Sequence, residues 1–113
     1  MPWCITGPIL TMEQAVRNYW SKLEIGGEEA AALFHPSGFF QVGGEKSVGR
    51  EALAAKLGPS SDAEDCEIVV KSWSFNEAAR TCTCEIECGG LAMCDVFQFD
   101  ASSFLIVSLH VYR

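Results

Sequence analysis

Residues 82–95 read CTCEIECGGLAMCD and place four cysteines and one aspartate within a short segment. Thiolates gathered in this way are typical of zinc sites, which need four ligands within about 2.0–2.3 Å of one point. The paired C-x-x-C spacing of zinc knuckles is absent from the segment. Whether the thiols of Cys82, Cys84, Cys88 and Cys94 can meet therefore depends on the geometry of the backbone that carries them.

The segment is predicted to form two antiparallel strands joined by a two-residue turn at Gly89 and Gly90. Side chains alternate between the faces of a strand, and directly paired residues share a face. This register pairs Cys84 with Asp95 and turns Cys94 to the opposite face. We therefore expect no metal site, and we expect the cysteines to fill the core as small apolar side chains. A three-residue turn would reverse the parity and bring Cys94 to the other thiols.

Asp95 is the residue of this segment that is most able to take part in chemistry. It shares its predicted face with the apolar side chains Leu91, Met93, Phe97 and Phe99. A carboxylate on an apolar face is costly unless it is hydrogen-bonded, metal-bound or protonated. Burial disfavours the charged form and is therefore expected to raise the pKa of Asp95.

The last predicted strand supplies possible partners for this acid. Pairing Phe99 with Phe104 places Ser108 opposite Asp95 and brings His110 to the same face. The unperturbed pKa of histidine, about 6.5, suits a general base. Tyr112 shares this face, which resembles the lining of a pocket. The other face holds Leu105, Val107, Leu109 and Val111, an aliphatic set that indicates dry packing or an interface with another subunit.

Composition indicates one compact domain that positions these residues. The chain has 113 residues, 49% of them hydrophobic, and a formal net charge of −7. A negative field repels phosphate, so nucleic acid and anionic membranes are poor partners. The start of the chain lacks the basic region of a signal peptide, so we expect a cytoplasmic protein with mostly free thiols. Residues 1–10 are interpreted as an N-terminal extension and 11–113 as the domain.

The predicted elements change from helices to strands along the chain. Thr11 and Gln14 have capping-box spacing before a helix that ends near Gly26. A second short helix is expected from Glu28 until Pro36 stops it, followed by a short strand, a glycine-rich turn over 43–46 and a helix over 49–57. Four strands then follow in an antiparallel meander, at about 67–75, 81–88, 91–99 and 104–112. This order predicts an α+β fold with helices on one face of a curved sheet.

The sequence resembles the nuclear transport factor 2-like superfamily, which includes ketosteroid isomerases and polyketide cyclases of the SnoaL type. The stretches that carry the resemblance are NYWSKLEIGGEEAAALF, VGREAL and CDVFQFD. It implies a cone-shaped half-barrel with N-terminal helices packed on a curved, mainly antiparallel sheet. It also implies a deep pocket on the concave face and a homodimer through the convex face. Tyr19 and Asp95 match the pair that donates hydrogen bonds to the oxyanion in the isomerases, whereas Val42 stands where those enzymes have their base.

The strand register and the resemblance together predict one site. Its catalytic candidates are Asp95, Tyr19 and His110, without a cofactor or metal. The lining is expected to comprise Trp20, Phe34, Cys84, Ile86, Met93, Phe97, Ser108 and Tyr112.

Each of the principal residues also has a structural interpretation. Asp95 would hold helix to sheet through Tyr19 or Ser108, and His110 would be a hydrogen-bonded core histidine. Trp73 belongs to the core, an interface or the pocket, depending on the register of the link over 76–80.

The site supports three functions at the level of sequence. The first is binding of a hydrophobic small molecule in the pocket. The second is an isomerase, cyclase or lyase that acts on a carbonyl compound by acid/base chemistry. The third is a non-catalytic dimerisation module. Neither the ligand nor the presence of catalysis follows from the residues alone.

Overall fold

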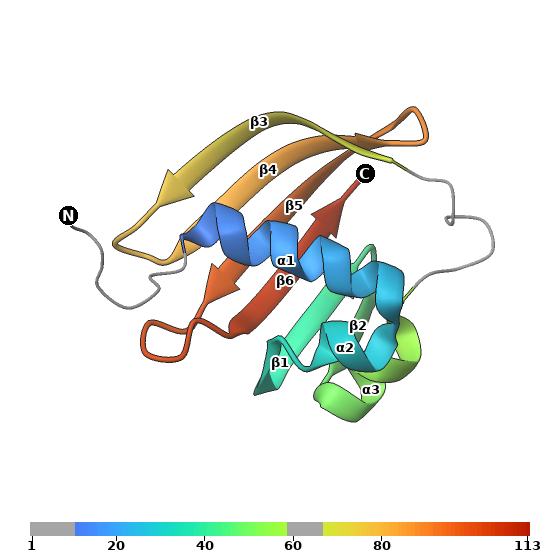
Figure 1. The fold of residues 1–113 in the computed structure, drawn as a ribbon, viewed down its shortest axis with the longest axis vertical. Helices are drawn as coiled ribbons and strands as arrows, with labels where there is room; N and C mark the ends of the chain where they lie inside the picture. The colour runs from blue at the N-terminus through green and yellow to red at the C-terminus, as the bar shows by residue number, and fades with distance from the viewer. Residues whose placement is uncertain (1–10, 59–66) are drawn as a thin grey trace.

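A curved sheet of six strands with helices on its concave side forms the computed structural model, which describes residues 11–58 and 67–113 (Figure 1). The strand order is β2-β1-β6-β5-β4-β3. Neighbouring strands are antiparallel except β1 and β6, which run parallel. The predicted α+β cone is confirmed. The expectation for the N-terminal extension over 1–10 lies outside the described residues.

The longest helix, α1 (Met12–Ile25), begins and ends where the sequence predicts. The Thr11 hydroxyl accepts a hydrogen bond from the Gln14 N–H, and the Gln14 side chain accepts one from the Thr11 N–H. Its buried residues are Met12, Ala15, Val16, Tyr19 and Trp20. Because they recur at helical spacing, one face of α1 packs onto the sheet and the other is solvated.

Two shorter helices, α2 (Gly27–Ala31) and α3 (Arg50–Lys56), lie together beside β1 and β2 (Figure 1). The Arg50 guanidinium donates two hydrogen bonds, from Nε and Nη2, to the Phe34 carbonyl oxygen at 3.0 and 2.8 Å. This contact fixes the start of α3 against the start of β1. None of the helices in the described ranges has the length and apolarity to cross a membrane.

The first half of the sheet differs from the prediction. β1 covers Phe34–Val42, so Pro36 lies inside a strand and not at a helix end. The register of β1 and β6 shifts between Phe34 and Phe39, which accommodates the proline in an irregular stretch. β2 (Glu45–Val48) pairs with β1 across Gly43 and Gly44, although the sequence around it was interpreted as a turn. A four-residue strand with three polar positions has too little alternation to be recognised.

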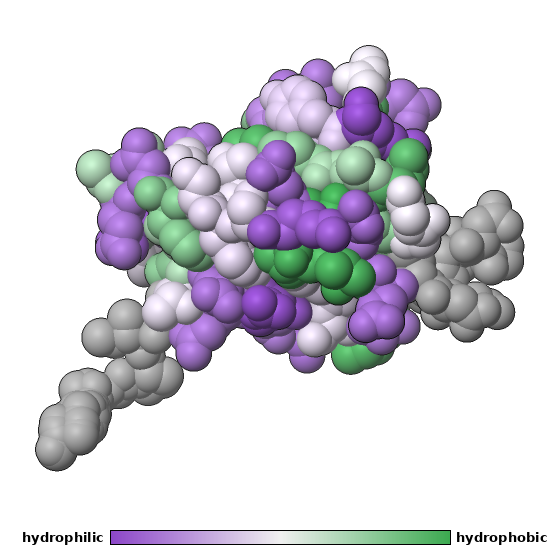
Figure 2. Space-filling view, turned by 90° about the horizontal axis from the view of Figure 1, so that it is seen from above, coloured by the Kyte–Doolittle hydropathy of each residue, from purple (hydrophilic) through white to green (hydrophobic). Residues whose placement is uncertain are grey.

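The remaining strands are β3 (Ile68–Asn76), β4 (Thr81–Cys88), β5 (Leu91–Phe99) and β6 (Ile106–Tyr112). Strand β3 lies at one edge of the sheet, and its Val69 and Phe75 are 46% and 44% exposed. Seen from the β3 side, hydrophilic side chains interrupt the apolar surface in several places (Figure 2). This edge is therefore not a continuous apolar strip.

The hairpin of β4 and β5 has the predicted register. Cys84 pairs with Asp95 and Glu85 with Cys94. Gly89 and Gly90 have φ angles of 60° and 82°, which two-residue hairpin turns of this type require and which glycine adopts without strain. The side chains of Cys84 and Cys94 consequently lie on opposite faces of the sheet.

The pairing of β4 and β5 also determines where the cysteine side chains lie. Cys82, Cys84 and Cys94 are free, the first two in the core. Cys88 is disulfide-bonded, whereas the other three cysteines of the described residues are free. Within residues 11–58 and 67–113, no group of histidine, cysteine, aspartate and glutamate side chains is arranged to hold a metal ion.

The register of β5 and β6 is where the prediction is wrong. The turn between them is longer than expected, because the Asp100 carboxylate accepts hydrogen bonds from the N–H and hydroxyl groups of Ser102 and Ser103. Phe99 therefore pairs with Ile106 and not with Phe104. That change alone moves the register by two residues and preserves the faces of β6.

A bulge then inverts these faces. Phe99 pairs with Ile106 but Gln98 pairs with Ser108, so Val107 is an extra residue in β6. Beyond this point Asp95 pairs with Val111, whereas His110 pairs with Val96. The predicted grouping of Ser108, His110 and Tyr112 with Asp95 is therefore wrong, as is the aliphatic outer face that included Leu109 and Val111.

The close approach of α2 and α3 gives a test of this packing. A Cβ on Gly27 would lie 2.1 Å from the Ala54 carbonyl oxygen and 2.7 Å from that of Leu57. We expect Gly27→Ala to lower the free energy of unfolding by about 1–3 kcal/mol, because the backbone of α3 must move. Gly44→Ala, whose Cβ meets no atom within 4 Å, should change it by less than about 0.5 kcal/mol. Urea denaturation of both variants measures the difference, and equal stabilities would contradict the close contact between the two helices.

Candidate functional site

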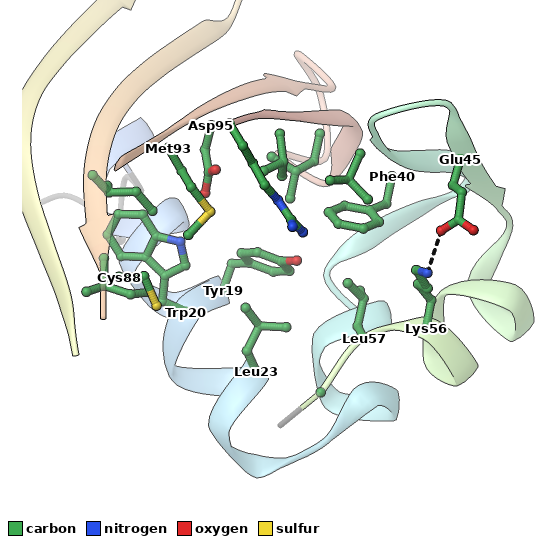
Figure 3. Close-up of a pocket in the computed structure, with 17 residues that line it drawn as sticks. Tyr19, Trp20, Leu23, Phe40, Glu45, Lys56, Leu57, Cys88, Met93 and Asp95 are labelled. Carbon is green, nitrogen blue, oxygen red and sulfur yellow. Dashed lines mark hydrogen bonds and ion pairs between the residues drawn. The ribbon is translucent and has the colours of Figure 1, made fainter. Parts of the chain in front are cut away.

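A cavity of about 410 Å³ lies between α1 and the concave face of the sheet (Figure 3). Most of its wall is apolar, and the apolar residues come from α1, β1, β3, β4, β5, β6 and the residue that follows α3. They are Leu23, Phe40, Val42, Leu57, Ile68, Ile86, Met93, Leu109 and Val111. A concave, mostly apolar site of this volume with a few polar groups is typical of small-molecule pockets.

Asp95 is the buried acid of this cavity. It projects from β5 and is 6% exposed. Burial raises the pKa of Asp95 from its ordinary value of 3.8 to about 6, and a hydrogen bond from the Trp20 side chain offsets part of the rise. Trp20 stands beside Asp95 on the neighbouring α1 (Figure 3). The predicted position of Asp95 on an apolar face and the direction of its pKa are confirmed.

Tyr19 supplies the second polar group. Its ring makes edge-to-face contacts with Phe34 and Phe97, with centroid distances of 5.8 and 5.7 Å. Its hydroxyl points into the cavity on the side of Phe40 and Leu57 (Figure 3). Burial, with a smaller contribution from the charge of Asp95, raises the pKa of Tyr19 well above its ordinary range. The phenol is therefore a neutral group at physiological pH.

The mouth of the cavity carries charged residues that the sequence did not indicate as part of the site. Lys56 Nζ lies 2.9 Å from Glu45 Oε1, and both side chains are exposed. Arg113 also lines the cavity. Glu45 was missed because β2 was not recognised: as the partner of Val42 across the hairpin, it points to the same face.

Five of the residues predicted for the site lie in the cavity wall. Asp95, Tyr19, Trp20, Ile86 and Met93 all line the cavity. Others lie in the core that supports it. Phe34, Phe97 and Cys84 are fully buried and are not part of the cavity wall.

His110 is not a cavity residue. Its ring lies on the outer face of the sheet, where it contacts Phe39 edge-on at 5.4 Å and stacks on Tyr112 at 6.1 Å. Ser108 pairs with Gln98 and Phe39 on that same face. The predicted association of the Asp95 carboxylate with a hydroxyl, an imidazole and a phenol from β6 is therefore wrong. The bulge at Val107 is the physical reason.

Cys84 and Trp73 lie beside Asp95 and Trp20 but outside the cavity. Burial, followed by the charge of Asp95, raises the pKa of the Cys84 thiol, so Cys84 is not an activated nucleophile. Trp73 pairs with Cys84 and packs against Trp20 with a centroid distance of 5.9 Å. The Arg17 guanidinium lies 5.2 Å from the centre of the Trp73 ring. These contacts hold the Trp20 indole in place beside Asp95.

Comparisons with known proteins identify the fold. No protein-family model and no curated protein matches the sequence. Solved structures match along nearly the whole chain. One is the epoxide hydrolase/cyclase-like enzyme SalBIII, described in pyran-ring formation in the polyether salinomycin, at 17% identity and a TM-score of 0.72. The match covers 89% of this chain and 88% of that one.

Two further structures show the same likeness. An NTF2-like protein of unknown function from Cytophaga hutchinsonii has 18% identity and a TM-score of 0.65 over 95% of this chain and 93% of that one. A hypothetical protein with a ketosteroid isomerase-like fold from Catenulispora acidiphila, in complex with trimethylamine, has 17% identity and a TM-score of 0.71 over 91% and 87%. The chain therefore has the NTF2-like cone fold that its sequence resembles.

The buried acid predicts a pH-dependent stability. Asp95 ionises near 3.8 in the unfolded chain and near 6 in the folded protein, so the folded state binds more protons between these values. Stability should therefore fall as the pH rises through this window. Asp95→Asn removes the titrating group, so its stability relative to the wild type should increase by about 3 kcal/mol between about pH 3.5 and 7.5. Urea denaturation across this range measures the change.

Asp100 provides a control, because its pKa is shifted in the opposite direction to that of Asp95. Hydrogen bonds from Ser103 and Ser102 lower the pKa of the exposed Asp100 to about 2. Asp100→Asn should therefore reduce stability at neutral pH, and its deficit should shrink as the pH falls toward 2. If the difference in free energy of unfolding between the wild type and Asp95→Asn does not vary with pH, the proposed desolvation of Asp95 is contradicted.

Proposed function

We propose that the protein binds a small hydrophobic molecule in the cavity, with Asp95 and Tyr19 as the polar groups that orient it. The observation that carries this proposal is the combination of a cavity of about 410 Å³ with a predominantly apolar wall and a buried carboxylate. Apolar surface transferred from water contributes about 25 cal/mol per Å², so such a wall favours an apolar ligand. Solved neighbours of this fold include a cyclase-like enzyme and a protein in complex with a small amine, which supports small-molecule binding.

The two polar groups are held by rigid elements. Tyr19 lies on α1, with its ring fixed by Phe34 and Phe97, and Asp95 lies within β5 beside Trp20. Pre-positioned groups reduce the entropy that a ligand loses on binding. The arrangement therefore suits recognition of a ligand with one polar end.

The acid/base alternative has less support. Asp95 has a pKa near 6, which suits proton transfer, but Val42 stands in the wall at the position of the family's base. His110, the other proton carrier expected, faces away from the cavity. Glu45 lines the mouth but is paired with Lys56, and this contact lowers the pKa of its carboxyl group. A weak base at the rim and a single buried acid make a binding site the better-supported function.

Filling the cavity gives a direct test of ligand binding. Val42 and Gln41 are neighbours on β1, and Val42 faces the cavity while Gln41 pairs with His110 on the outer face. Val42→Trp should weaken the binding of the neutral probe isobutylbenzene by about tenfold or more, because the indole occupies space that the probe needs. Gln41→Trp should leave the affinity within about threefold of the wild type. NMR titration measures both affinities, and equal effects of the two substitutions would contradict binding inside the cavity.

We further propose that the outer face of the sheet forms a homodimer. An outer patch consists of Phe39, Val48, Val96, His110 and Tyr112, which share this face through the pairing of β2, β1, β6 and β5. Val48 and Tyr112 are 55% and 56% exposed. None of the five residues is acidic, although the chain carries a net charge of −7, and the nearby Lys46 places its Nζ 4.1 Å from the centre of the Phe39 ring. A second copy of the chain is the occupant that this face suits.

A charge placed in the outer patch tests the dimer. Tyr112→Glu should convert a dimer to monomers, because two buried carboxylates would face each other across the interface. Leu91→Glu makes the same apolar-to-acidic change at a residue that is 52% exposed outside the patch, and it should leave the dimer intact. Sedimentation velocity at one protein concentration measures both. A wild-type monomer, or equal behaviour of the two variants, would contradict the interface.

A further inference from the structure

We propose that the ligand of this cavity is an organic amine whose protonated nitrogen donates a hydrogen bond to Asp95 while its hydrocarbon part contacts the aromatic and aliphatic wall. This inference rests on the proposed function, because it specifies the chemical class of the molecule that the cavity binds. It excludes a neutral apolar compound as the preferred ligand.

The first argument concerns charge, because no lysine, arginine or histidine of the described residues forms an ion pair with the buried Asp95 carboxylate. The causes that set the pKa of Asp95 are burial and the hydrogen bond from Trp20, and they include no cation among the described residues. Lys56 lines the mouth but is held by Glu45 at 2.9 Å. Arg113 also lines the cavity, but it is not among the causes that shift the pKa of Asp95. A buried carboxylate is costly unless it is paired, so a cationic ligand would supply the missing partner.

The second argument concerns hydrogen bonding. An ionised carboxylate accepts several hydrogen bonds and donates none. The Trp20 side chain is the donor that affects the Asp95 carboxylate. Acceptor capacity therefore remains on a side chain that lines the cavity. An ammonium group supplies both a donor and a positive charge, and such charge-assisted bonds are about twice as strong as neutral ones.

The third argument is the aromatic wall. Tyr19, Trp20 and Phe40 line the cavity, and Trp20 and Tyr19 flank the region below Asp95 (Figure 3). The faces of aromatic rings attract cations, with tryptophan the most effective. Since burial keeps the Tyr19 phenol neutral, it adds no second negative charge that would compete with Asp95 for the amine.

The proposal predicts a specific pH dependence. Asp95 changes its charge near pH 6, whereas an alkylamine, like lysine, remains protonated below about pH 9. Among the groups facing the cavity, Tyr19 and the neighbouring Cys84 stay neutral because their pKa values are raised. Glu45 stays ionised because the pKa of its carboxyl group is lowered, and Cys88 is disulfide-bonded. Amine affinity should therefore rise about tenfold between about pH 5 and pH 7.5 as Asp95 ionises.

Two probes of equal shape separate the amine from the hydrocarbon. N,N-dimethylbenzylamine differs from isobutylbenzene by a protonated nitrogen in place of a CH group. In calorimetric titrations of the full chain at about pH 7.5, the amine should bind at least about tenfold more tightly than the hydrocarbon. This advantage should largely disappear at about pH 5, whereas the affinity for isobutylbenzene should not depend on pH.

Variants identify the responsible group. Asp95→Asn should weaken binding of the amine by about tenfold or more and leave isobutylbenzene within about threefold. Glu51→Gln removes an exposed carboxylate of α3 that does not line the cavity, and it should leave the affinity for the amine within about threefold, since general attraction to an acidic surface is not the cause. The pH series on the wild-type protein tests the same group without any substitution.

The outcomes distinguish the two proposals. Equal affinities of amine and hydrocarbon, or an amine preference that survives in Asp95→Asn, would overturn the amine assignment and leave the hydrophobic pocket standing. Failure of both probes to bind to the wild-type protein would overturn the pocket as well.

Discussion

A single extra residue in β6 determines the character of the site. Val107 lies between Ile106 and Ser108, which pair with the adjacent residues Phe99 and Gln98. Every side chain of β6 beyond this bulge is turned to the opposite face from the one it would otherwise occupy. Leu109 and Val111 thereby line the cavity, and His110 is on the outside. The part of the wall that β6 contributes is aliphatic for this reason, and β6 places neither a base nor a cation beside Asp95.

The buried acid and the cavity are consequences of the same packing. The aromatic face of α1 covers the concave sheet over Phe34 and Phe97, which removes water from the base of the cone. Water removal raises the pKa values of Asp95 and Tyr19, because both polar groups lie in the cavity wall with little access to solvent. The Trp20 indole, packed on Trp73, gives the carboxylate one hydrogen bond and leaves acceptor capacity for a ligand. Sites of this kind retain an electrostatic cost in the free protein that a complementary ligand can relieve.

The fold by itself does not specify the chemistry. Solved structures with this cone include a cyclase-like enzyme and proteins of unknown function, all at low identity to this chain. Function in such a scaffold depends on the few polar residues that the wall carries. In this chain they are Asp95 and Tyr19 at depth and the pair of Glu45 and Lys56 at the mouth. Val42 cannot accept a proton. The base of the acid/base chemistry that the resemblance to the isomerases implies is therefore missing at this position.

The sequence by itself determined the helices, the β4–β5 hairpin and the burial of Asp95, because these depend on local patterns. The capping box of Thr11 and Gln14, the alternation over 81–88 and the glycine pair at 89–90 each act within a few residues. Only the tertiary structure decided which face of β6 meets Asp95. That choice depends on a turn held by the Asp100 side chain and on a bulge at Val107, and a change of one residue in strand pairing leaves no periodic signal in the sequence. It also decided the place of Glu45, since the short polar strand β2 forms only where β1 offers it hydrogen-bond partners.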